Sequence, residues 1–280
     1  MNIINILDEI EKVDADVYDR LNPRRAAMKD FFSVGKKVAA ASVPFAIGAM
    51  FKKAYAQSAP SDAIVGVLQF ALALEHFESA FYVRGFNEAG FNGTYAAADK
   101  AAIGIIRDHE ANHVKFLQGV LSGAGKTPVT PKTYDFTAGG TFPNTFANYP
   151  TFLAVAQALE DTGVRAYKGA APTLIRQSVY LTAALNIHSV EARHAAKIRY
   201  MRLLNGHSTT IKPWITGNDN TTGTATAAIY AGEETVMQAG LNITAINGTG
   251  VTAAAASESF DEPLTPEQVT AIVRPFGVTF

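Results

Sequence analysis

The 280-residue sequence contains no cysteine, only one tryptophan and a formal net charge of only −1. The lack of cysteine excludes disulfide bonds, thiolate metal ligands and cysteine nucleophiles. The balanced charge favours neither nucleic acid nor an anionic membrane as a partner, so we expect neither. Hydrophobic residues make up 48% of the chain, which is enough for a sizeable core. A metal site in this chain would have to be built from carboxylates and imidazoles.

Two Glu-x-x-His motifs occur in the chain, at residues 110–113 and 191–194. Positions three apart share one face of a helix, so each motif can present a carboxylate and an imidazole to one metal ion. A single glutamate precedes each motif, and this order is typical of a two-metal site inside a four-helix bundle. The predicted metal ligands are Glu75, Glu110, His113, Glu160, Glu191 and His194.

The same pattern is an internal repeat. Glu75 and Glu160 are each followed seven residues later by a tyrosine, Tyr82 and Tyr167. Seven residues is close to two helical turns, so each tyrosine lies on the face of its glutamate. The two halves are therefore interpreted as two copies of one helical hairpin. The tyrosines are predicted to pack with a hydrogen-bonded hydroxyl, or to act beside the site as hydrogen-bond donors or radical sites.

With these residues the chain resembles the ferritin-like diiron-carboxylate superfamily. It is most similar to the branch of bacterial and plant proteins that includes desiccation-related proteins. The resemblance covers about residues 60–280 and includes the ending Ser-Phe-Asp-Glu-Pro-Leu-Thr at 259–265 and Pro-Phe at 275–276. It implies an all-α ferritin-like four-helix bundle, made of two helical hairpins joined by a long crossover.

The resemblance also implies two metal ions, Fe or Mn, with Zn an alternative in a recombinant sample. Glu110 and Glu191 would bridge the ions, and Glu75 and Glu160 would be terminal ligands. The alternative without metal is a core ion pair of Glu110 with His113 or with an arginine of the helix at 151–169. We favour the metal because four carboxylates on one axis repel one another without cations.

Two functions follow from such a site. The first is an oxidoreductase that uses O2 or peroxide in stress protection. The second is a non-catalytic protein, either metal-binding or with a desiccation-related structural role. An iron-storage cage is a weaker reading, because storage ferritins are shorter than this chain.

Composition divides the chain into three parts. Residues 1–57 are an N-terminal segment, residues 58–206 the four-helix bundle, and residues 207–280 a C-terminal extension that packs on the bundle or forms a contact in a homo-oligomer. The bundle helices are predicted at residues 62–86, 96–121, 151–169 and 172–204. Pro172 suits the first turn of the fourth helix.

The segment 123–150, rich in Gly, Pro, Thr and Asn, is predicted to be the crossover between the hairpins. Its aromatic side chains are expected to anchor it to the bundle, or else to line an entry for substrate. In the extension, residues 207–257 are expected to be mostly irregular, with a short helix near 228–237. A second short helix is predicted at 264–274, with Thr265 as its N-cap and Gln268 at N3.

Three further polar residues are predicted to support the site or to lie in solvent. Glu78, three residues after Glu75, is expected to be solvated or to stand beside the site without binding metal. His188, three before Glu191, is predicted to hold a site carboxylate by a hydrogen bond. Glu233 is predicted to lie on the solvated surface.

The N-terminal segment is interpreted as an export signal of twin-arginine or Sec type. Arg24-Arg25 precedes the uncharged run from Val38 to Phe51, and Ala54-Tyr55-Ala56 is typical of a cleavage site. The run is too short to span a bilayer, which takes about 20 residues. The alternative is a retained helical arm, because residues 1–22 are acidic and amphipathic, and the protein would then be cytoplasmic.

If the signal is cleaved, the protein acts in the periplasm or cell envelope. Protein isolated from its native host should then begin near Gln57 or Ser58, as N-terminal sequencing would show. An intact Met1 on the functional protein would contradict this expectation.

Overall fold

The structure is a computed structural model that describes residues 60–87, 96–218, 221–246 and 250–280. The export signal predicted within residues 1–57 lies outside the described residues. Everything below concerns the compact unit that contains the described residues.

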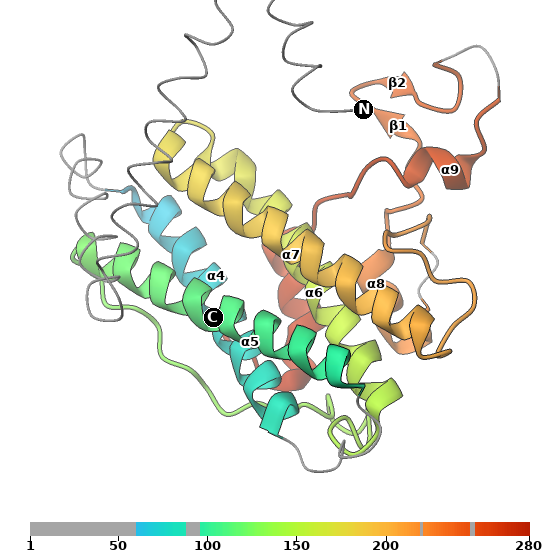
Figure 1. Ribbon diagram of the computed structural model, residues 1–280. Helices are drawn as coiled ribbons and strands as arrows, with labels where there is room; N and C mark the ends of the chain where they lie inside the picture. Colours follow the sequence, from blue (N-terminus) through green and yellow to red (C-terminus); the bar gives the residue numbers. More distant parts are fainter. Residues whose placement is uncertain (1–59, 88–95, 219–220, 247–249) are drawn as a thin grey trace, which may run out of the picture. The chain divides into compact units, whose positions relative to one another are not determined.

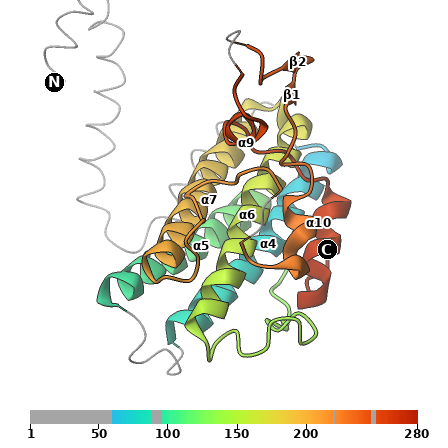
Figure 2. The same cartoon turned by 90° about the vertical axis from the view of Figure 1, so that its right-hand side faces the viewer.

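Four long helices make up the bundle (Figures 1 and 2). They are α4 (Asp62–Asn87), α5 (Ala97–Gly123), α6 (Tyr149–Leu174) and α7 (Ser178–Leu204). Helix α4 pairs with α5 and helix α6 with α7, and the segment 124–148 crosses from one hairpin to the other. The predicted fold class, an all-α ferritin-like bundle of two hairpins, is confirmed.

Hydrogen bonds at one end of the bundle fix the direction of its helices. The Tyr149 hydroxyl, at the start of α6, donates to Asp99 Oδ2 over 2.9 Å near the start of α5. Asn205, just after α7, donates its amide to the same oxygen over 2.8 Å. Helices α6 and α7 are therefore antiparallel. Side chains near the middle of each helix, on the faces that the two helices turn to each other, can meet halfway along the bundle.

One predicted helix boundary is wrong. Pro172 was expected to begin the fourth helix, but it lies inside α6, which continues to Leu174, and α7 begins at Ser178. A proline near the end of a helix costs one hydrogen bond and a local clash. Leu174, which ends this last turn, is fully buried.

The aromatic residues of the crossover anchor it, as predicted. Phe136 and Phe146 are buried and pack edge-on against each other, and both contact Phe81 of α4. Phe142 stacks on Phe276 near the C-terminus. The crossover therefore joins the first hairpin to the end of the chain.

The C-terminal extension contributes short elements. They are η2 (Thr224–Thr226), α8 (Ala227–Tyr230), β1 (Met237–Gln238), β2 (Leu241–Asn242), α9 (Ala253–Ser257), α10 (Pro266–Val273) and η3 (Arg274–Phe276). The capping box of α10 is present as predicted, with Thr265 and Gln268 bonding each other's backbone. Buried side chains of α10, η3 and the residues around them belong to the same hydrophobic core as α4 and α6.

The helix predicted at 228–237 is largely wrong. Only α8, of four residues, forms there, and the chain then enters the antiparallel hairpin β1–β2. Its turn is made by Ala239 and Gly240, both with positive φ, at 50° and 82°. Positive φ at both central residues matches the twist of a two-residue hairpin turn, but alanine is a rare choice for it.

Buried charged residues fasten the extension to the bundle. Asp161 of α6 accepts hydrogen bonds from Arg199 of α7 (2.5 and 3.2 Å) and from the Tyr230 hydroxyl (2.7 Å). Arg165 pairs with Glu233 at 2.8 Å. Glu233 was predicted to be solvated, and this is wrong: it is 2% exposed because it neutralises a buried guanidinium.

In the part of the chain that is described, α4 is the one helix long and apolar enough to cross a membrane by length and composition. More than half of its most apolar stretch is buried within the protein. Its apolar character is therefore accounted for by its place in the bundle core.

Replacing Asp161 with Ala should lower the free energy of unfolding by about 3 to 5 kcal/mol, because Arg199 would be left buried without its partner. Urea denaturation monitored by circular dichroism measures this change. The matched control is Glu258→Gln, which weakens the exposed pair with Lys212 and should cost less than about 1 kcal/mol. Equal losses of unfolding free energy in the two variants would contradict a stabilising role for the buried Asp161–Arg199 pair.

Candidate metal centre

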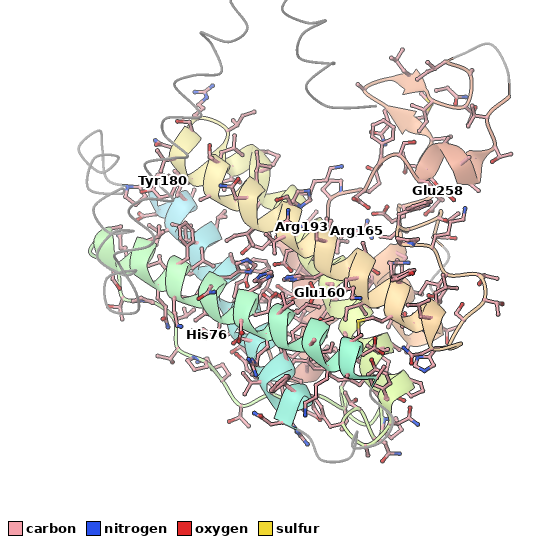
Figure 3. All side chains as sticks on the ribbon, viewed as in Figure 1. His76, Glu160, Arg165, Tyr180, Arg193 and Glu258 are labelled. Carbon is pink, nitrogen blue, oxygen red and sulfur yellow. The ribbon has the colours of Figure 1, made fainter. Side chains whose placement is uncertain are left out.

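The six predicted ligands come from all four bundle helices. Helix α4 supplies Glu75, and helix α6 supplies Glu160, the residue labelled in Figure 3. The two Glu-x-x-His motifs are on α5 and α7. The four glutamates are fully buried, and the two histidines keep only small exposed fractions. The structure thus brings all six side chains together inside the bundle.

Within this cluster the ligand atoms fall into two groups. The first consists of Glu75, Glu110, His113 and Glu191, and the second of Glu110, Glu160, Glu191 and His194. In each group the ligand atoms lie within 4.8 Å of one another. Glu110 and Glu191 belong to both groups, so the two groups share two carboxylates.

Both histidines turn Nδ1 toward the carboxylates. His113 Nδ1 lies 3.1 Å from Glu75 Oε2, and 3.2 and 3.3 Å from oxygens of Glu110 and Glu191. His194 Nδ1 lies 2.8 Å from Glu110 Oε1. The two oxygens of Glu110 therefore face one histidine each.

The two tyrosines cross between the hairpins. Tyr82, on the helix of Glu75, donates its hydroxyl to Glu160 Oε1. Tyr167, on the helix of Glu160, donates its hydroxyl to Glu75 Oε1. The other oxygen of each glutamate faces a histidine Nδ1, at 3.1 Å for Glu75 and 3.3 Å for Glu160. The predicted hydrogen-bonded hydroxyls are present, and each holds the glutamate of the opposite hairpin.

Several buried polar atoms of the cluster lack a hydrogen bond. They are Glu110 Oε1, Glu160 Oε2, both carboxylate oxygens of Glu191 and His194 Nδ1. An unsatisfied buried polar group costs about 1 to 3 kcal/mol, and more when it is charged. These atoms belong to one shared group of candidate ligands, and together they are the hard oxygen and imidazole donors that Fe and Mn accept. The donor set therefore fits a bound metal.

The electrostatics show how strongly the cluster needs positive charge. Burial raises the pKa of Glu75 to about 7, although His113 counteracts it, and raises that of Glu191 well above its usual range. Burial also raises the pKa of Glu110, but the close approach of the two histidines outweighs it and brings the value to about 2. Burial lowers the pKa of His194, but the carboxylates outweigh it and raise the value to about 11. Without metal, protons on these groups supply the charge balance.

A fifth carboxylate stands beside the cluster. Glu78 is 4% exposed, so the prediction that it could be solvated is wrong, and it is placed instead beside the site. Burial raises its pKa well above the usual range, and the charge of Glu191 adds to this. The Glu-x-x-Glu spacing from Glu75 to Glu78 is the sequence feature that indicates this position.

Gly163 makes room for these carboxylates, and the sequence reading missed it. A Cβ at this position would lie 2.9 Å from Glu191 Oε2 and 3.3 Å from Glu78 Oε1. In the internal repeat Gly163 follows Glu160 by three residues, as Glu78 follows Glu75. One half of the repeat thus carries a carboxylate where the other half leaves space.

The remaining histidines near the cluster differ from one another. His188 was predicted to hold a site carboxylate, but its Nδ1 lies 2.9 Å from the carbonyl oxygen of Val164. This carbonyl is on α6, against which α7 packs, so the imidazole pairs with backbone instead. His109 Nδ1 lies 2.9 Å from Nε2 of His194 and so orients the ring of a candidate ligand.

The fold and the cluster define a class of protein: a bundle of two helical hairpins whose core holds Glu and His side chains able to bind metal. The family described as "Ferritin-like domain" matches residues 63–203, half of the chain, and the protein belongs to this family. A comparison with curated proteins finds none that matches the chain.

Gly163→Ala should weaken metal binding while leaving the fold intact. The new methyl group would displace the flexible end of Glu191 from the cluster, and changes next to a ligand cost roughly tenfold or more in metal affinity. Titration with Mn2+ or Fe2+ under anaerobic conditions measures the change.

The control is Gly66→Ala on α4, where a Cβ meets no atom within 4 Å. Because alanine is favoured over glycine in helices by about 1 kcal/mol, this control should stabilise the protein and leave metal binding unchanged. Equal affinities in the two variants would show that Gly163 is not needed by the cluster.

Proposed function

We propose that the cluster binds two divalent metal ions, Fe or Mn. The observation that carries the proposal is the pair of ligand groups that share Glu110 and Glu191. In this arrangement the two shared carboxylates would bridge the ions, and Glu75 and Glu160 would be terminal ligands. Each histidine contributes Nδ1. The four ligand carboxylates supply four negative charges, which two divalent ions balance.

The choice of metal is argued from the donors. Carboxylate oxygens with imidazole suit Fe and Mn, whereas raw affinity alone favours Cu or Zn over both. Availability in the cell therefore decides occupancy, and a recombinant sample can carry Zn instead. The absence of thiolates from the chain agrees with a hard-ligand site.

We further propose that the loaded protein is an oxidoreductase that consumes O2 or peroxide in stress protection, because the two ligand groups would hold two redox-active ions side by side. Two adjacent Fe or Mn ions supply, when bound, the electrons for reducing such an oxidant. The chain's own residues prepare the site. The hydroxyls of Tyr82 and Tyr167 fix one oxygen of each terminal glutamate, so that the other oxygen is directed at the ligand group.

Burial supports this function over a simple surface metal site. The ligand carboxylates are fully excluded from solvent, and Phe81 and Phe152 pack against the ring of Tyr82. Electrostatic interactions are stronger in a site from which water is excluded, and reactive species are kept from side reactions there.

Protein expressed in medium supplemented with Fe or Mn should contain two metal equivalents per chain by elemental analysis. The bound metal should also be oxidised when O2 or H2O2 is added, and optical or electron paramagnetic resonance spectroscopy would follow this change. Two inert zinc ions, or no metal, would instead support a structural role for the cluster.

Glu110→Ala should abolish occupancy of both metal positions, because this carboxylate belongs to both ligand groups. The far-UV circular dichroism should stay largely unchanged, since the substitution removes a buried charge without breaking a helix. Asp108→Ala is the matched control, because Asp108 is an exposed carboxylate on the same helix that pairs with Arg107. A variant at Glu110 that retains two metal ions would overturn the bridging assignment.

A further inference from the structure

The two ligand groups share Glu110 and Glu191, but they differ in how their atoms are occupied. The atoms of the cluster that lack a hydrogen bond are Glu110 Oε1, Glu160 Oε2, both oxygens of Glu191 and His194 Nδ1. All of them belong to the second group, which consists of Glu110, Glu160, Glu191 and His194. Every member of this group therefore offers at least one buried ligand atom that has no hydrogen-bond partner among the described residues.

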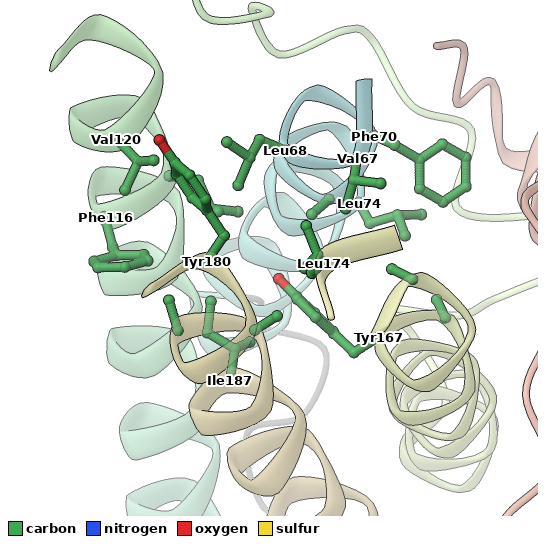
Figure 4. Close-up of a pocket in the computed structure, with 16 residues that line it drawn as sticks. Val67, Leu68, Phe70, Leu74, Phe116, Val120, Tyr167, Leu174, Tyr180 and Ile187 are labelled. Carbon is green, nitrogen blue, oxygen red and sulfur yellow. The ribbon is translucent and has the colours of Figure 1, made fainter. Parts of the chain in front are cut away.

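The first group already has hydrogen bonds at its ligand atoms. His113 Nδ1 donates to Glu75 Oε2 at 3.1 Å and to Glu110 Oε2 at 3.2 Å. The other oxygen of Glu75 accepts from Tyr167, whose ring lines an apolar pocket at one end of the bundle (Figure 4). An ion that enters the first group has to displace the hydrogen bonds of His113, whereas the unpartnered atoms of the second group have none to lose.

A histidine outside the two groups supports the second one. His109 Nδ1 lies 2.9 Å from Nε2 of His194. The two rings are nearly parallel, at 19°, and their centroids lie 5.2 Å apart. Ring faces in van der Waals contact stay about 3.5 Å or more apart, so two nitrogens this close meet at the edges of the rings. An imidazole nitrogen carries its hydrogen or its lone pair at the ring edge, so the contact is a hydrogen bond between the two rings.

This hydrogen bond determines which nitrogen of His194 can bind an ion. A neutral imidazole binds metal through the nitrogen that carries no hydrogen, and the hydrogen bond of the other nitrogen selects it. When Nε2 of His194 donates to His109, its Nδ1 carries the lone pair, and Nδ1 faces Glu110 and Glu160 at 2.8 and 3.3 Å. His109 thus holds the ring plane of His194 and keeps its ligand atom directed at the second group.

The internal repeat provides no counterpart of His109 for His113. His109 directly precedes the first Glu-x-x-His motif, and the matching position before the second motif is Val190, whose side chain forms no hydrogen bonds. Within the described part of the chain, the hydrogen bonds of His113 are made by Nδ1. The side chain of His113 is 12% exposed, against 5% for His194. The imidazole of the first group is therefore oriented from one side, by the carboxylates.

We propose that the second group is the tighter of the two metal positions and fills first, and that His109 is the positioning residue for its imidazole. This inference rests on the proposed function, because both groups must bind a divalent ion for one to fill before the other. It adds to that function an order of filling and a role for a residue that binds neither ion.

Anaerobic titration of the full chain with Mn2+ tests the order of filling, and the electron paramagnetic resonance signal of free Mn2+ measures the unbound ion. The parent protein should bind two ions in two steps whose affinities differ by about tenfold or more. His109→Phe keeps an aromatic ring but lacks the acceptor nitrogen. It should weaken the tighter step by roughly tenfold or more and change the weaker step by less than about threefold.

Two further variants separate the hydrogen bond from the bulk of the side chain. His109→Asn offers an amide oxygen that can accept from Nε2 of His194, so it should restore most of the affinity of the tighter step. Ala101→Phe introduces the same aromatic side chain at an exposed position about two turns earlier on α5. This control should bind both ions as the parent protein does.

Nitrogen-15 magnetic resonance tests the tautomer in the parent protein loaded with one equivalent of Zn2+, which is diamagnetic. His194 should be the histidine that binds the ion, with its hydrogen on Nε2 and slow exchange of that hydrogen with water. His109→Phe should lose the slow exchange, and His109→Asn should keep it. A purely structural role of His109 would leave this signal unchanged.

The outcomes distinguish this inference from the proposed function. A parent protein that binds no divalent ion would overturn both. Two ions bound with equal affinity, or a tighter step that is unchanged in His109→Phe, would overturn this inference and leave the proposed function standing. The same holds if the first equivalent of Zn2+ binds at His113, or if His194 carries its hydrogen on Nδ1. These resonance measurements use the parent protein, so they remain decisive even if a variant does not fold.

Discussion

The structure depends on the burial of acidic groups that cannot stand together unless positive charge lies among them. Four glutamates from four helices meet in the core, with Glu78 beside them. In water such groups would repel one another only weakly, but at low dielectric the cost rises steeply. Protonated imidazoles or bound cations remove this cost. Neutralising the centre therefore stabilises the bundle.

The supporting contacts follow from this constraint. Tyr82 and Tyr167 each cross to the glutamate of the opposite hairpin, so the two hairpins are tied together by the groups that orient the cluster. Glycine is a poor helix former, but at position 163 its lack of a side chain leaves room for the carboxylates of Glu191 and Glu78. Outside the cluster, the charge of Arg165 is balanced in the same way, by Glu233 from the extension. Each of these buried groups is thus held by a partner that is distant in the sequence.

Periodicity could predict the four long helices, because it depends on spacing along single segments. The repeated order of Glu and Glu-x-x-His could predict that the six candidate ligands meet, because it is typical of one bundle arrangement. Pro172 was misplaced because a proline fits both the first turn of a helix and, at some cost, the last. The roles of Gly163 and Glu233 could not be predicted, since each is defined by a neighbour on another element. The turn at Ala239 was missed for a local reason: alanine seldom adopts positive φ.

The repeat makes the cluster nearly symmetric, but its surroundings are not. Tyr82 and Tyr167 make equivalent hydrogen bonds, but their rings have different neighbours. Phe81 and Phe152 pack against the ring of Tyr82, whereas the ring of Tyr167 lines a narrow apolar pocket where α4 and α7 begin. Both hydroxyls donate to a glutamate, so the two tyrosines differ in the side chains around their rings. Two copies of one hairpin thus form a centre with two similar groups of candidate ligands and unequal surroundings.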